Sequence, residues 1–508
     1  MAREYTNLEK NRLEKMERLR AQGMEPYPTR AERTHTSQQA IQAFEQAEKE
    51  NAEATVQAIL AGRIRSIRVM GKITFAHIED GAGRVQLFFR ADDVGQEALD
   101  LFNLEFDLGD FIQASGEMFR TRTGEVTLRV KSFRMLAKAI TPLPAAKDEF
   151  VDGQVVRHAT LADPETRYRQ RYADLAVNSE VRDIFRARAG VVRALREFLD
   201  SKGFIEVETP ILQPIYGGAA ARPFVTFHNQ LKQELYLRIS FELYLKRLLV
   251  GNLERVYEIG RDFRNEGVDR THNPEFTQIE FYWAYADYLQ VMQLTEEMIA
   301  FAADQVVGAR RVVFQGQELN FEPPWRRVDL SQGILETSGV DIRKHTSAKS
   351  LAAEMSSKGM QPDPNATRGK LIDALLSNFL EPVLIQPTFI YDYPRDISPL
   401  AKSKPGDPTT VERFEGFVAG MELCNAFTEL NDSLDQESRF LEMGRDYGAE
   451  DEERHPMDED YLRAMRYGMP PNGGFGMGVD RLTMLLTDSP NIREVMLFPH
   501  LREQEGAA

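Results

Sequence analysis

A single cysteine, Cys424, is present among the 508 residues. One cysteine excludes an internal disulfide and a zinc site built from cysteine ligands. Cys424 could act as a nucleophile in principle, but an isolated cysteine is usually a small, half-buried packing residue. We therefore expect the chemistry of this chain to depend on other residue types.

Long apolar runs and an excess of positive charge are lacking as well. No apolar run approaches the roughly 18 residues of a membrane span, and the N-terminal stretch MAREYTNLEKNRLEKMERLR is charged without the apolar core of a signal peptide. The 79 acidic and 63 basic side chains give a net charge of −16, which argues against a general polyanion-binding surface. We expect a soluble, cytosolic protein with no membrane contact and only local nucleic-acid contacts.

The chain is long enough for more than one hydrophobic core. With 508 residues and 42% hydrophobic side chains, two or more domains are expected. Short strands with glycine turns predict a small closed barrel over residues 58–143. We assign 1–57 to a charged helical segment, 144–178 to a hinge, 179–503 to a larger domain with a helical insertion at about 325–380, and 504–508 to a tail.

Residues 255–288 predict two strands joined by a ten-residue loop. This loop, 265–274, is longer than closure of a hairpin requires, which favours a function for it. In the second strand, 275–285, side chains alternate with a period of two, so one face presents Phe276, Gln278, Glu280 and Tyr282. An aromatic ring followed by polar and charged groups indicates a ligand-binding face.

Further carboxylates fit the same kind of site. Asn425, Phe427 and Glu429 alternate on another predicted strand and could form, with the first face, a pocket for a cationic side chain. Glu415 and Glu422 could hold magnesium with triphosphate oxygens completing its shell, although paired glutamates are more often solvated. Glu242 begins a helix predicted over 242–250, where the plain explanation is that it complements the helix dipole.

The run GGFGMGVDR, residues 473–481, is not a dinucleotide-binding fingerprint, because Val479 follows its last glycine and no acidic residue follows in a strand–helix–strand context. Gly474, Gly476 and Gly478 would instead clear one face of a strand for a flat ligand. Arg481 falls in the first turn of the following helix, where its guanidinium and the helix N-terminus could both face phosphate.

Within the predicted barrel, residues 120–138 carry six basic side chains and one acidic one, Glu125, which suggests a contact with backbone phosphates. The six are Arg120, Arg122, Arg129, Lys131, Arg134 and Lys138. Phe75 and Gln86 fall on adjacent predicted strands and suit stacking on, and reading of, an unpaired base. The alternative is that Phe75 belongs to the barrel core and the basic residues only solvate a strand.

Three segments resemble the signature motifs of class II aminoacyl-tRNA synthetases. They are the helix at 179–202 with FIEVETP, the segment FRNEGVDRTHNPEFTQIEFY, and GGFGMGVDRL. The strings HNPEFT, GGAAARPF and CNAFTELND resemble those of the lysyl-tRNA synthetase family, which shares a subgroup with the aspartate and asparagine enzymes. The resemblance covers about residues 58–503. It implies an α+β fold: an N-terminal OB-fold β-barrel, then a catalytic domain on a mixed, mainly antiparallel sheet flanked by helices.

The resemblance also implies a role for each matching position. ATP would contact Arg264, Glu266, His272, Asn273, Phe276 and Arg481, with Arg264 and Arg481 as the catalytic residues. Lysine would contact Gly218, Glu242, Arg264, Glu280, Tyr282, Asn425, Phe427 and Glu429. Magnesium would be held by Glu415 and Glu422, and anticodon bases by Arg68, Phe75 and Gln86. One departure is Phe241, where proline is commoner; it puts the start of the helix in doubt but not the Glu242 carboxylate.

The activity implied is activation of L-lysine by ATP and transfer of the lysyl group to the 3′ end of tRNA(Lys), with Mg²⁺, by a cytoplasmic homodimer. Three alternatives stay open. A protein-modifying lysine ligase of the same catalytic fold would lack the barrel, and a catalytically dead RNA-binding homologue would have lost Arg264, Arg481 or a magnesium ligand. An enzyme specific for aspartate or asparagine would not favour a pocket with three carboxylates.

Overall fold

The computed structural model describes residues 4–51, 55–144, 147–151, 154–158, 161–446 and 456–502. The chain divides into two compact units, one made of residues up to 164 together with 172–177, and the other of 165–171 and the residues from 178 onward. The tail expected at 504–508 lies outside the described residues. None of the described helices combines the length and apolar character needed to cross a membrane.

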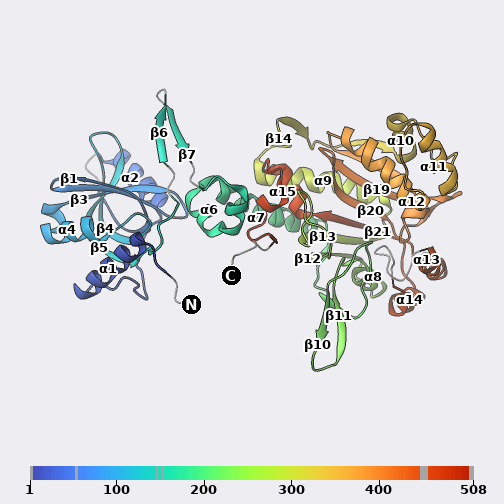
Figure 1. The fold of residues 1–508 in the computed structure, drawn as a ribbon, viewed down its shortest axis with the longest axis horizontal. Coiled ribbons are helices and arrows are strands. Elements are labelled where there is room, and N and C mark those ends of the chain that lie inside the picture. Colours follow the sequence, from blue (N-terminus) through green and yellow to red (C-terminus); the bar gives the residue numbers. More distant parts are fainter. Residues whose placement is uncertain are drawn as a thin grey trace. The chain divides into compact units, whose positions relative to one another are not determined.

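The N-terminal unit contains a closed barrel whose strands are hydrogen-bonded in the order β1-β2-β3-β5-β4 (Figure 1). The strands are β1 (Val56–Met70), β2 (Ile73–Glu79), β3 (Arg84–Arg90), β4 (Phe111–Arg120) and β5 (Val126–Ala137). Alternate side chains point inward, so Ala76, Ile78, Leu87 and Phe89 are buried in one core. The unit also contains α1 (Asn7–Ala21), α2 (Ser37–Glu50), α3 (Ala91–Val94), α4 (Gln96–Glu105), the hairpin β6 (Lys147–Val151) and β7 (Gln154–His158), and α6 (Arg171–Val177).

The two N-terminal helices begin at capping boxes, in which the side chains of Thr6 and Thr36 accept a hydrogen bond from the backbone N–H three residues later. Helix α1 is held to its neighbours by charge, since Arg18 lies 2.8 Å from Glu105 of α4. Leu19 and Phe44 pack into the barrel core. A thin apolar stripe is therefore sufficient for α1, because ion pairs supply part of its attachment.

The larger unit is built on a nine-stranded sheet. Its strands are β8 (Ile205–Glu206), β12 (Arg255–Phe263), β13 (Glu275–Ala284), β16 (Arg326–Asp329), β17 (Thr388–Pro394), β18 (Ser403–Lys404), β19 (Asp407–Val418), β20 (Met421–Thr428) and β21 (Asn472–Gly478). The order is β16-β17-β19-β20-β21-β13-β12-β8, with β18 paired to β19. Among the described strands of this sheet, only the β8–β12 and β16–β17 pairs are parallel. The predicted mixed, mainly antiparallel sheet is confirmed.

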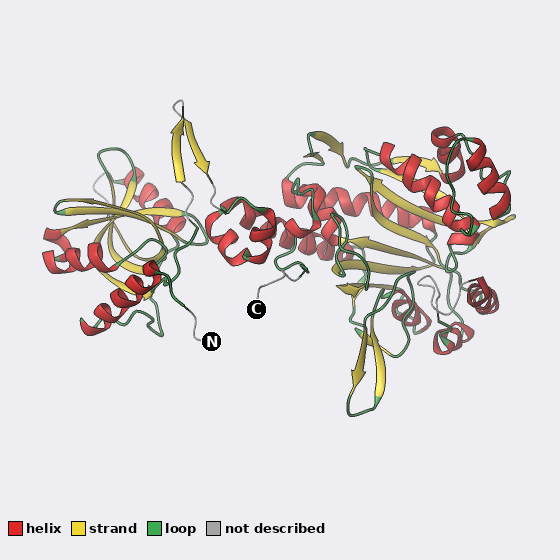
Figure 2. Cartoon of the chain, viewed as in Figure 1, coloured by secondary structure: helices red, strands yellow, loops and turns green. Residues whose placement is uncertain are grey.

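Helices α7 (Ser179–Ser201), α9 (Tyr288–Val307) and α15 (Val479–Leu486) pack their apolar residues with the sheet in one large core (Figure 2). Helix α7 is followed by Gly203 with φ +79°, the left-handed conformation that glycine adopts without strain. Helix α8 (Glu242–Val250) has the predicted bounds and packs on β12 and β13. Because α9 covers one face of the central strands, the opposite face is left for a ligand.

The remaining elements lie around this sheet. They are α5 (Pro164–Arg169), the small sheet β9 (Leu212–Gln213), β10 (Val225–His228) and β11 (Gln233–Leu237), the hairpin β14 (Arg311–Phe314) and β15 (Gln317–Asn320), and the helices α10 (Leu330–Ser338), α11 (Ala348–Ser357), α12 (Arg368–Leu375), α13 (Ser433–Asp446) and α14 (Glu459–Arg466). Helices α10, α11 and α12 share a separate apolar core with β17. The helical insertion that contains α10, α11 and α12 therefore packs on the edge of the sheet.

Candidate active site

A pocket of about 330 Å³ lies over β13, β20 and β21. These strands are adjacent in the sheet. A Cβ on Gly473 would contact Val291 of α9 at 2.6 Å, whereas a Cβ on Gly474 would lie 1.9 Å from Glu429 Oε1, and one on Gly476 2.9 Å from Gln278 Nε2. The pocket therefore lies on the face turned away from α9, and the predicted cleared strand face is confirmed.

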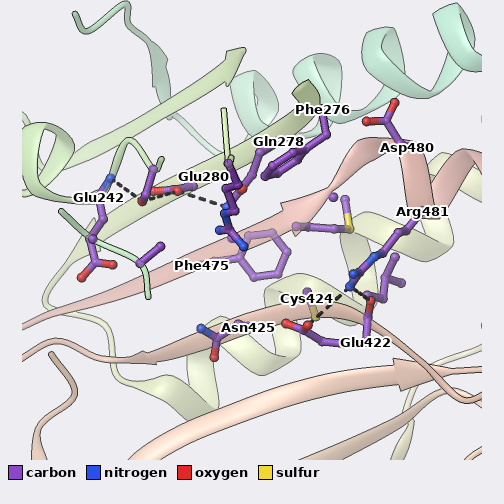
Figure 3. A pocket seen from close by; sticks show the side chains of 18 of the residues that line it. Glu242, Phe276, Gln278, Glu280, Glu422, Cys424, Asn425, Phe475, Asp480 and Arg481 are labelled. Carbon is purple, nitrogen blue, oxygen red and sulfur yellow. Dashed lines mark hydrogen bonds and ion pairs between the residues drawn. The ribbon is translucent and has the colours of Figure 1, made fainter. Parts of the chain in front are cut away.

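The pocket has two chemically different ends (Figure 3). Glu242 and Glu280 lie at one end, and Phe276 and Arg481 lie at the other. Arg264 and the loop residues Glu266, His272 and Asn273 also line it. The long loop between β12 and β13 thus contributes to the wall, as its length suggested.

Glu280 is the centre of the acidic end. Its Oε1 accepts hydrogen bonds from Ser240 Oγ at 2.8 Å, from Gln278 Nε2 at 3.1 Å and from the Phe241 backbone N–H at 3.3 Å. Its Oε2 accepts one from the Tyr282 hydroxyl at 3.1 Å. Burial raises the pKa of Glu280 well above its usual range, and the nearby acids Asp262 and Glu242 add to the shift. A bound cation would favour the ionised carboxylate and so lower the pKa of Glu280 again.

Glu242 and Glu429 share a buried cation at the same end. Lys246 Nζ donates to Glu242 Oε1 at 2.8 Å and to Glu429 Oε2 at 2.5 Å. Burial raises the pKa of Glu429 to about 8 and also raises the pKa of Glu242, with Lys246 opposing both shifts. Glu429 Oε1 is buried and has no hydrogen-bond partner in the described part of the chain. A substrate ammonium group would give it one.

The other residues predicted to contact lysine lie around these carboxylates. Gly218 has φ +89°, and a Cβ there would lie 2.9 Å from Ser240 Oγ and 3.0 Å from Glu242 Cβ, so only glycine leaves this space open. Asn425 accepts a hydrogen bond from Arg413 Nε at 3.0 Å. The Phe427 ring centroid lies 5.8 Å from Lys246 Nζ. All three positions line the pocket.

The other end presents an aromatic ring and two arginines. The guanidinium of Arg264 lies over the Phe276 ring, 5.2 Å from its centroid. Within the described ranges, Arg264 Nε and Asn273 Oδ1 are both buried and lack a hydrogen-bond partner. The Asn273 amide Nδ2 donates to the Glu275 carbonyl at 2.5 Å. Unsatisfied polar atoms at this end are consistent with a polar ligand that completes their hydrogen bonds.

Arg481 connects this end to the loop and to β20. Its Nη1 donates to the Glu422 carbonyl oxygen at 2.5 Å and lies 3.4 Å from Glu422 Oε2, and its Nη2 lies 3.0 Å from His272 Nε2. The other imidazole nitrogen of His272 lies 2.8 Å from Asp269 Oδ2. Arg481 therefore lies between the loop and the predicted magnesium ligand, as a phosphate clamp would.

Glu415 and Glu422 offer oxygen donors suited to magnesium. Burial raises the pKa of Glu415 to about 7, and repulsion by Glu422 contributes to the shift. Glu415 already accepts from Tyr393 OH at 2.7 Å and from Arg413 Nη2 at 2.5 Å. No cluster of three or more His, Cys, Asp or Glu side chains fit for a metal occurs in the described part of the chain. Glu422 lines the pocket, whereas both carboxylate oxygens of Glu415 are already hydrogen-bonded, so the magnesium site stays a prediction.

Four polar residues of the site were not predicted. Lys246, Ser240 and the buried pair Arg238 and Asp262 line or underlie the acidic end; Arg238 Nε lies 3.4 Å from Asp262 Oδ1. Burial raises the pKa of Asp262 to about 7. Lys246 follows Glu242 by four residues in a helix, a spacing that places both side chains on one face and could have revealed the pair.

Cys424 is not a nucleophile in this environment. It lies in β20 with 2% of its surface exposed, and a Cβ on Gly416 would contact its Sγ at 2.6 Å. Burial raises the pKa of its thiol, so the thiol stays protonated at neutral pH. Cys424 is a packing residue, as expected of an isolated cysteine.

The predicted base-reading residues share the outer face of the barrel. Arg68 is paired across the strands with Phe75, and His77 with Gln86. The neighbours Thr74 and Ala76 are buried in the core while Phe75 is half-buried and packs against the Phe88 ring at 5.0 Å. Gln86 donates to Glu125 Oε2 at 2.7 Å. The alternative that Phe75 belongs to the barrel core is wrong.

The basic residues at 120–138 do not form one continuous phosphate-binding stripe. Lys138 is buried and donates to Asp107 at 2.6 Å and to Asp110 at 2.8 Å. Arg120 lies 2.6 Å from Glu48, and Lys131 lies 2.7 Å from Asp93. The prediction is wrong for Lys138, because a buried and neutralised ammonium cannot reach a phosphate. Sequence alone did not reveal its acidic partners, which lie on other elements.

An OB-type barrel joined to a sheet with this pocket defines a class of tRNA synthetase. The family described as tRNA synthetases class II (D, K and N) matches residues 163–502, and the OB-fold nucleic acid binding domain of the anticodon-binding type matches residues 58–136. The chain therefore belongs to the class II tRNA synthetase family that contains the D, K and N enzymes. The predicted family and fold are confirmed.

Within that family, the chain is similar over its full length to proteins named lysine–tRNA ligase. The protein from Roseiflexus castenholzii is 53% identical over 503 residues, which covers 99% of this chain and 100% of the relative. The protein from Chloroflexus aurantiacus is 52% identical, with 99% of each chain covered. The protein from Pelotomaculum thermopropionicum is 49% identical, with 97% of this chain and 94% of the relative covered.

Proposed function

We propose that this protein is a lysine–tRNA ligase, which activates L-lysine with ATP to lysyl-adenylate and transfers the lysyl group to the 3′ end of tRNA(Lys). One observation carries the proposal: a single pocket has three buried carboxylates, Glu242, Glu280 and Glu429, at one end and Arg264 and Arg481 at the other. The first end suits an amino acid with two ammonium groups, and the second suits a triphosphate. The full-length similarity to lysine–tRNA ligases supports it.

In the first step the lysine carboxylate attacks the α-phosphorus of ATP. A bond forms between the carboxylate oxygen and phosphorus, the bond to the β-phosphate oxygen breaks, and pyrophosphate leaves. In the second step a ribose hydroxyl of the tRNA attacks the activated carbonyl carbon, loses its proton and releases AMP. No protein nucleophile is needed, so the task of the protein is positioning and stabilisation of charge.

The residues of the nucleotide end would hold the reacting phosphate. Arg264 would bridge the lysine carboxylate and the α-phosphate, and Arg481 would hold the far phosphates. Phe276 would stack on adenine, while Glu266, His272 and Asn273 would complete the ATP contacts from the loop. Because Arg264 now lies over the Phe276 ring, its guanidinium would turn from the ring to the phosphate as ATP binds.

Magnesium, when bound by Glu415 and Glu422, would neutralise the triphosphate and polarise its oxygens. Arg481 lies 3.4 Å from Glu422 Oε2 and would therefore approach the same phosphates as the ion. Protein residues would also orient the triphosphate. Glu422 is held in place because its backbone carbonyl accepts a hydrogen bond from Arg481 Nη1 at 2.5 Å.

The lysine end would select its substrate by charge. Gly218 and Glu242 would receive the α-ammonium group, Glu280, Tyr282, Asn425 and Glu429 the ε-ammonium, and Phe427 would pack along the methylene chain. A neutral or acidic side chain would leave buried carboxylates unpaired, at a cost of several kcal/mol. This argues against activation of aspartate or asparagine.

The anticodon of the tRNA would bind the outer face of the barrel through Arg68, Phe75 and Gln86. We propose that the protein acts as a homodimer in the cytoplasm, where tRNA is charged. The barrel at 58–136 also argues against a ligase that modifies a protein, since such relatives lack it.

The test is ATP–pyrophosphate exchange with each of the 20 amino acids, followed by aminoacylation of tRNA. We expect exchange with lysine and not with aspartate or asparagine, and attachment of labelled lysine to tRNA(Lys). Exchange with a different amino acid would overturn the proposed substrate. Exchange with lysine but no charging of tRNA, together with labelling of a protein, would favour the protein-modifying ligase.

A further inference from the structure

Lys246 is a buried cation bonded to two of the carboxylates that line a pocket proposed to bind a cation. Its side chain has no exposed surface, and its Nζ lies 2.8 Å from Glu242 Oε1 and 2.5 Å from Glu429 Oε2. None of the roles proposed above uses this ammonium group. A buried charge needs partners of opposite sign. The two carboxylates bonded to Lys246 are, however, also proposed to bind the substrate.

Charged and titratable groups from several elements act on Lys246 or on its two partners. Glu242 of α8, Glu429 after β20 and Tyr461 of α14 act on Lys246 itself. Arg413 of β19 acts on Glu242, and Glu280 and Tyr282 of β13 interact with the same carboxylates. The Tyr461 ring centroid lies 5.7 Å from Nζ, and the Phe427 ring centroid 5.8 Å. These rings close the remaining sides of the ammonium group and exclude water from it.

Lys246 divides the oxygen atoms of Glu429 between protein and ligand. Oε2 accepts from Lys246, whereas Oε1 has no hydrogen-bond partner among the residues that the structure describes and lies where a Cβ on Gly474 would come within 1.9 Å of it. Oε1 therefore faces the cleared strand face of the pocket. The ammonium holds the carboxylate with one oxygen turned toward the ligand.

We propose that Lys246 is a positioning residue that sets the charge of the substrate end to match two ammonium groups. This rests on the proposed function. With Glu242, Glu280 and Glu429 ionised, Lys246 reduces three negative charges to two, and the α- and ε-ammonium groups of lysine balance these while Arg264 takes the substrate carboxylate. Without Lys246 the pocket would carry one carboxylate too many, and a carboxyl group would keep its proton up to a higher pH than in wild type.

The proton makes the proposal measurable. Burial raises the pKa of Glu429 to about 8 even with Lys246 beside it, so removal of the ammonium would raise the pKa further. Binding of lysine would then have to release that proton. The apparent affinity for lysine would fall about tenfold for each pH unit below the new pKa, whereas ATP binding at the other end would not change.

The experiment compares wild type with Lys246→Met, Lys246→Gln, which keeps a hydrogen-bond donor without the charge, and Lys246→Arg, which keeps the charge. Lys349→Met, at an exposed position in α11, is the matched control. The KM for lysine and for ATP is measured by pyrophosphate exchange across pH, and the protons released on lysine binding by calorimetry in buffers of different ionisation enthalpy. Thermal unfolding monitors folding, and the Gln variant decides if the Met variant does not fold.

We expect both neutral variants to show a lysine KM raised at least about tenfold at pH 7, a KM–pH curve moved to higher pH by about one unit or more, and extra proton release. The Arg variant should return toward the wild-type curve. Neutral variants that lose stability or kcat but keep the wild-type curve and proton count would overturn the proposal. If wild type exchanges with another amino acid instead, the proposed function fails, and the same curves measured with that amino acid still decide the role of Lys246.

Discussion

Replacement of Glu280 by glutamine tests the acidic end of the pocket with little change in shape. Glu280 accepts from three donors at Oε1 and from the Tyr282 hydroxyl at Oε2. In Glu280→Gln the amide oxygen can keep the three donors, and the amide nitrogen can donate to the Tyr282 hydroxyl, which can accept as well as donate. The hydrogen bonds within the protein are therefore retained, and the charge is lost.

The lost charge should therefore weaken binding of the ligand's ammonium group. A hydrogen bond from an ammonium group to a carboxylate contributes about 1.5–3 kcal/mol, and a buried charge left without its partner adds to the cost. A total of about 2–4 kcal/mol corresponds to a kcat/KM for lysine that is roughly 30- to 1,000-fold lower. The KM for ATP should not change, because Glu280 lies at the end of the pocket away from Phe276 and Arg481 (Figure 3).

Lysine-dependent ATP–pyrophosphate exchange measures both constants. Glu275→Gln is the matched control, since Glu275 lies on the same strand with 53% of its side chain exposed and 3.6 Å from Arg261. We expect that variant to behave like wild type. A Glu280→Gln enzyme within about threefold of wild type for lysine would refute the assignment of this end to the ε-ammonium group.

Three further predictions use other parts of the molecule. Gly474→Ala should abolish exchange with lysine, because the added Cβ would lie 1.9 Å from Glu429 Oε1 and 2.5 Å from the Tyr282 ring. The control is Gly81→Ala, whose added Cβ would have no described heavy atom within 4 Å and which should leave exchange unchanged. Normal exchange by Gly474→Ala would contradict the pocket geometry. In wild type, burial raises the pKa of Glu429 to about 8, so the carboxylate is protonated below that pH and the lysine KM should rise as pH falls from 9 to 7; a flat KM profile would exclude titration of Glu429 on binding. Phe75→Ala should raise the KM for tRNA in aminoacylation by roughly 5- to 150-fold, the loss of one stacked base, and leave pyrophosphate exchange intact. Leu104→Ala, at an exposed apolar position of α4 in the same unit, serves as control, and an unchanged tRNA KM in Phe75→Ala would remove Phe75 from the anticodon contacts.

Local patterns were sufficient to predict the elements that carry the site. The period of two over β13 placed Glu280 and Tyr282 on one face, and the glycine alternation of β21 identified the strand face that a ligand can approach. The helix predicted over 242–250 has the same bounds as α8. These features depend on backbone geometry over a few consecutive residues, so a short stretch of sequence is enough to predict them.

Contacts between distant segments were not predictable in this way. Lys246 and Glu429 are 183 positions apart, and Lys138 and Asp107 are 31 apart, so no spacing rule connects them. Their pairing depends on which strands become neighbours in the sheet and which side chains the packing then removes from water. The basic residues at 120–138 look alike in the sequence, but burial made Lys138 part of the core.

The sequence by itself determined the family, the strand faces and the identity of the residues with pocket chemistry, because each is encoded in short motifs and local periodicity. Tertiary structure alone decided the charge of the pocket. Strand order brings Glu242, Glu280 and Glu429 together and places Lys246 among them, and burial makes each of these charges depend on the others. Electrostatic energies depend on distances and solvent exposure, which exist only once the chain has folded.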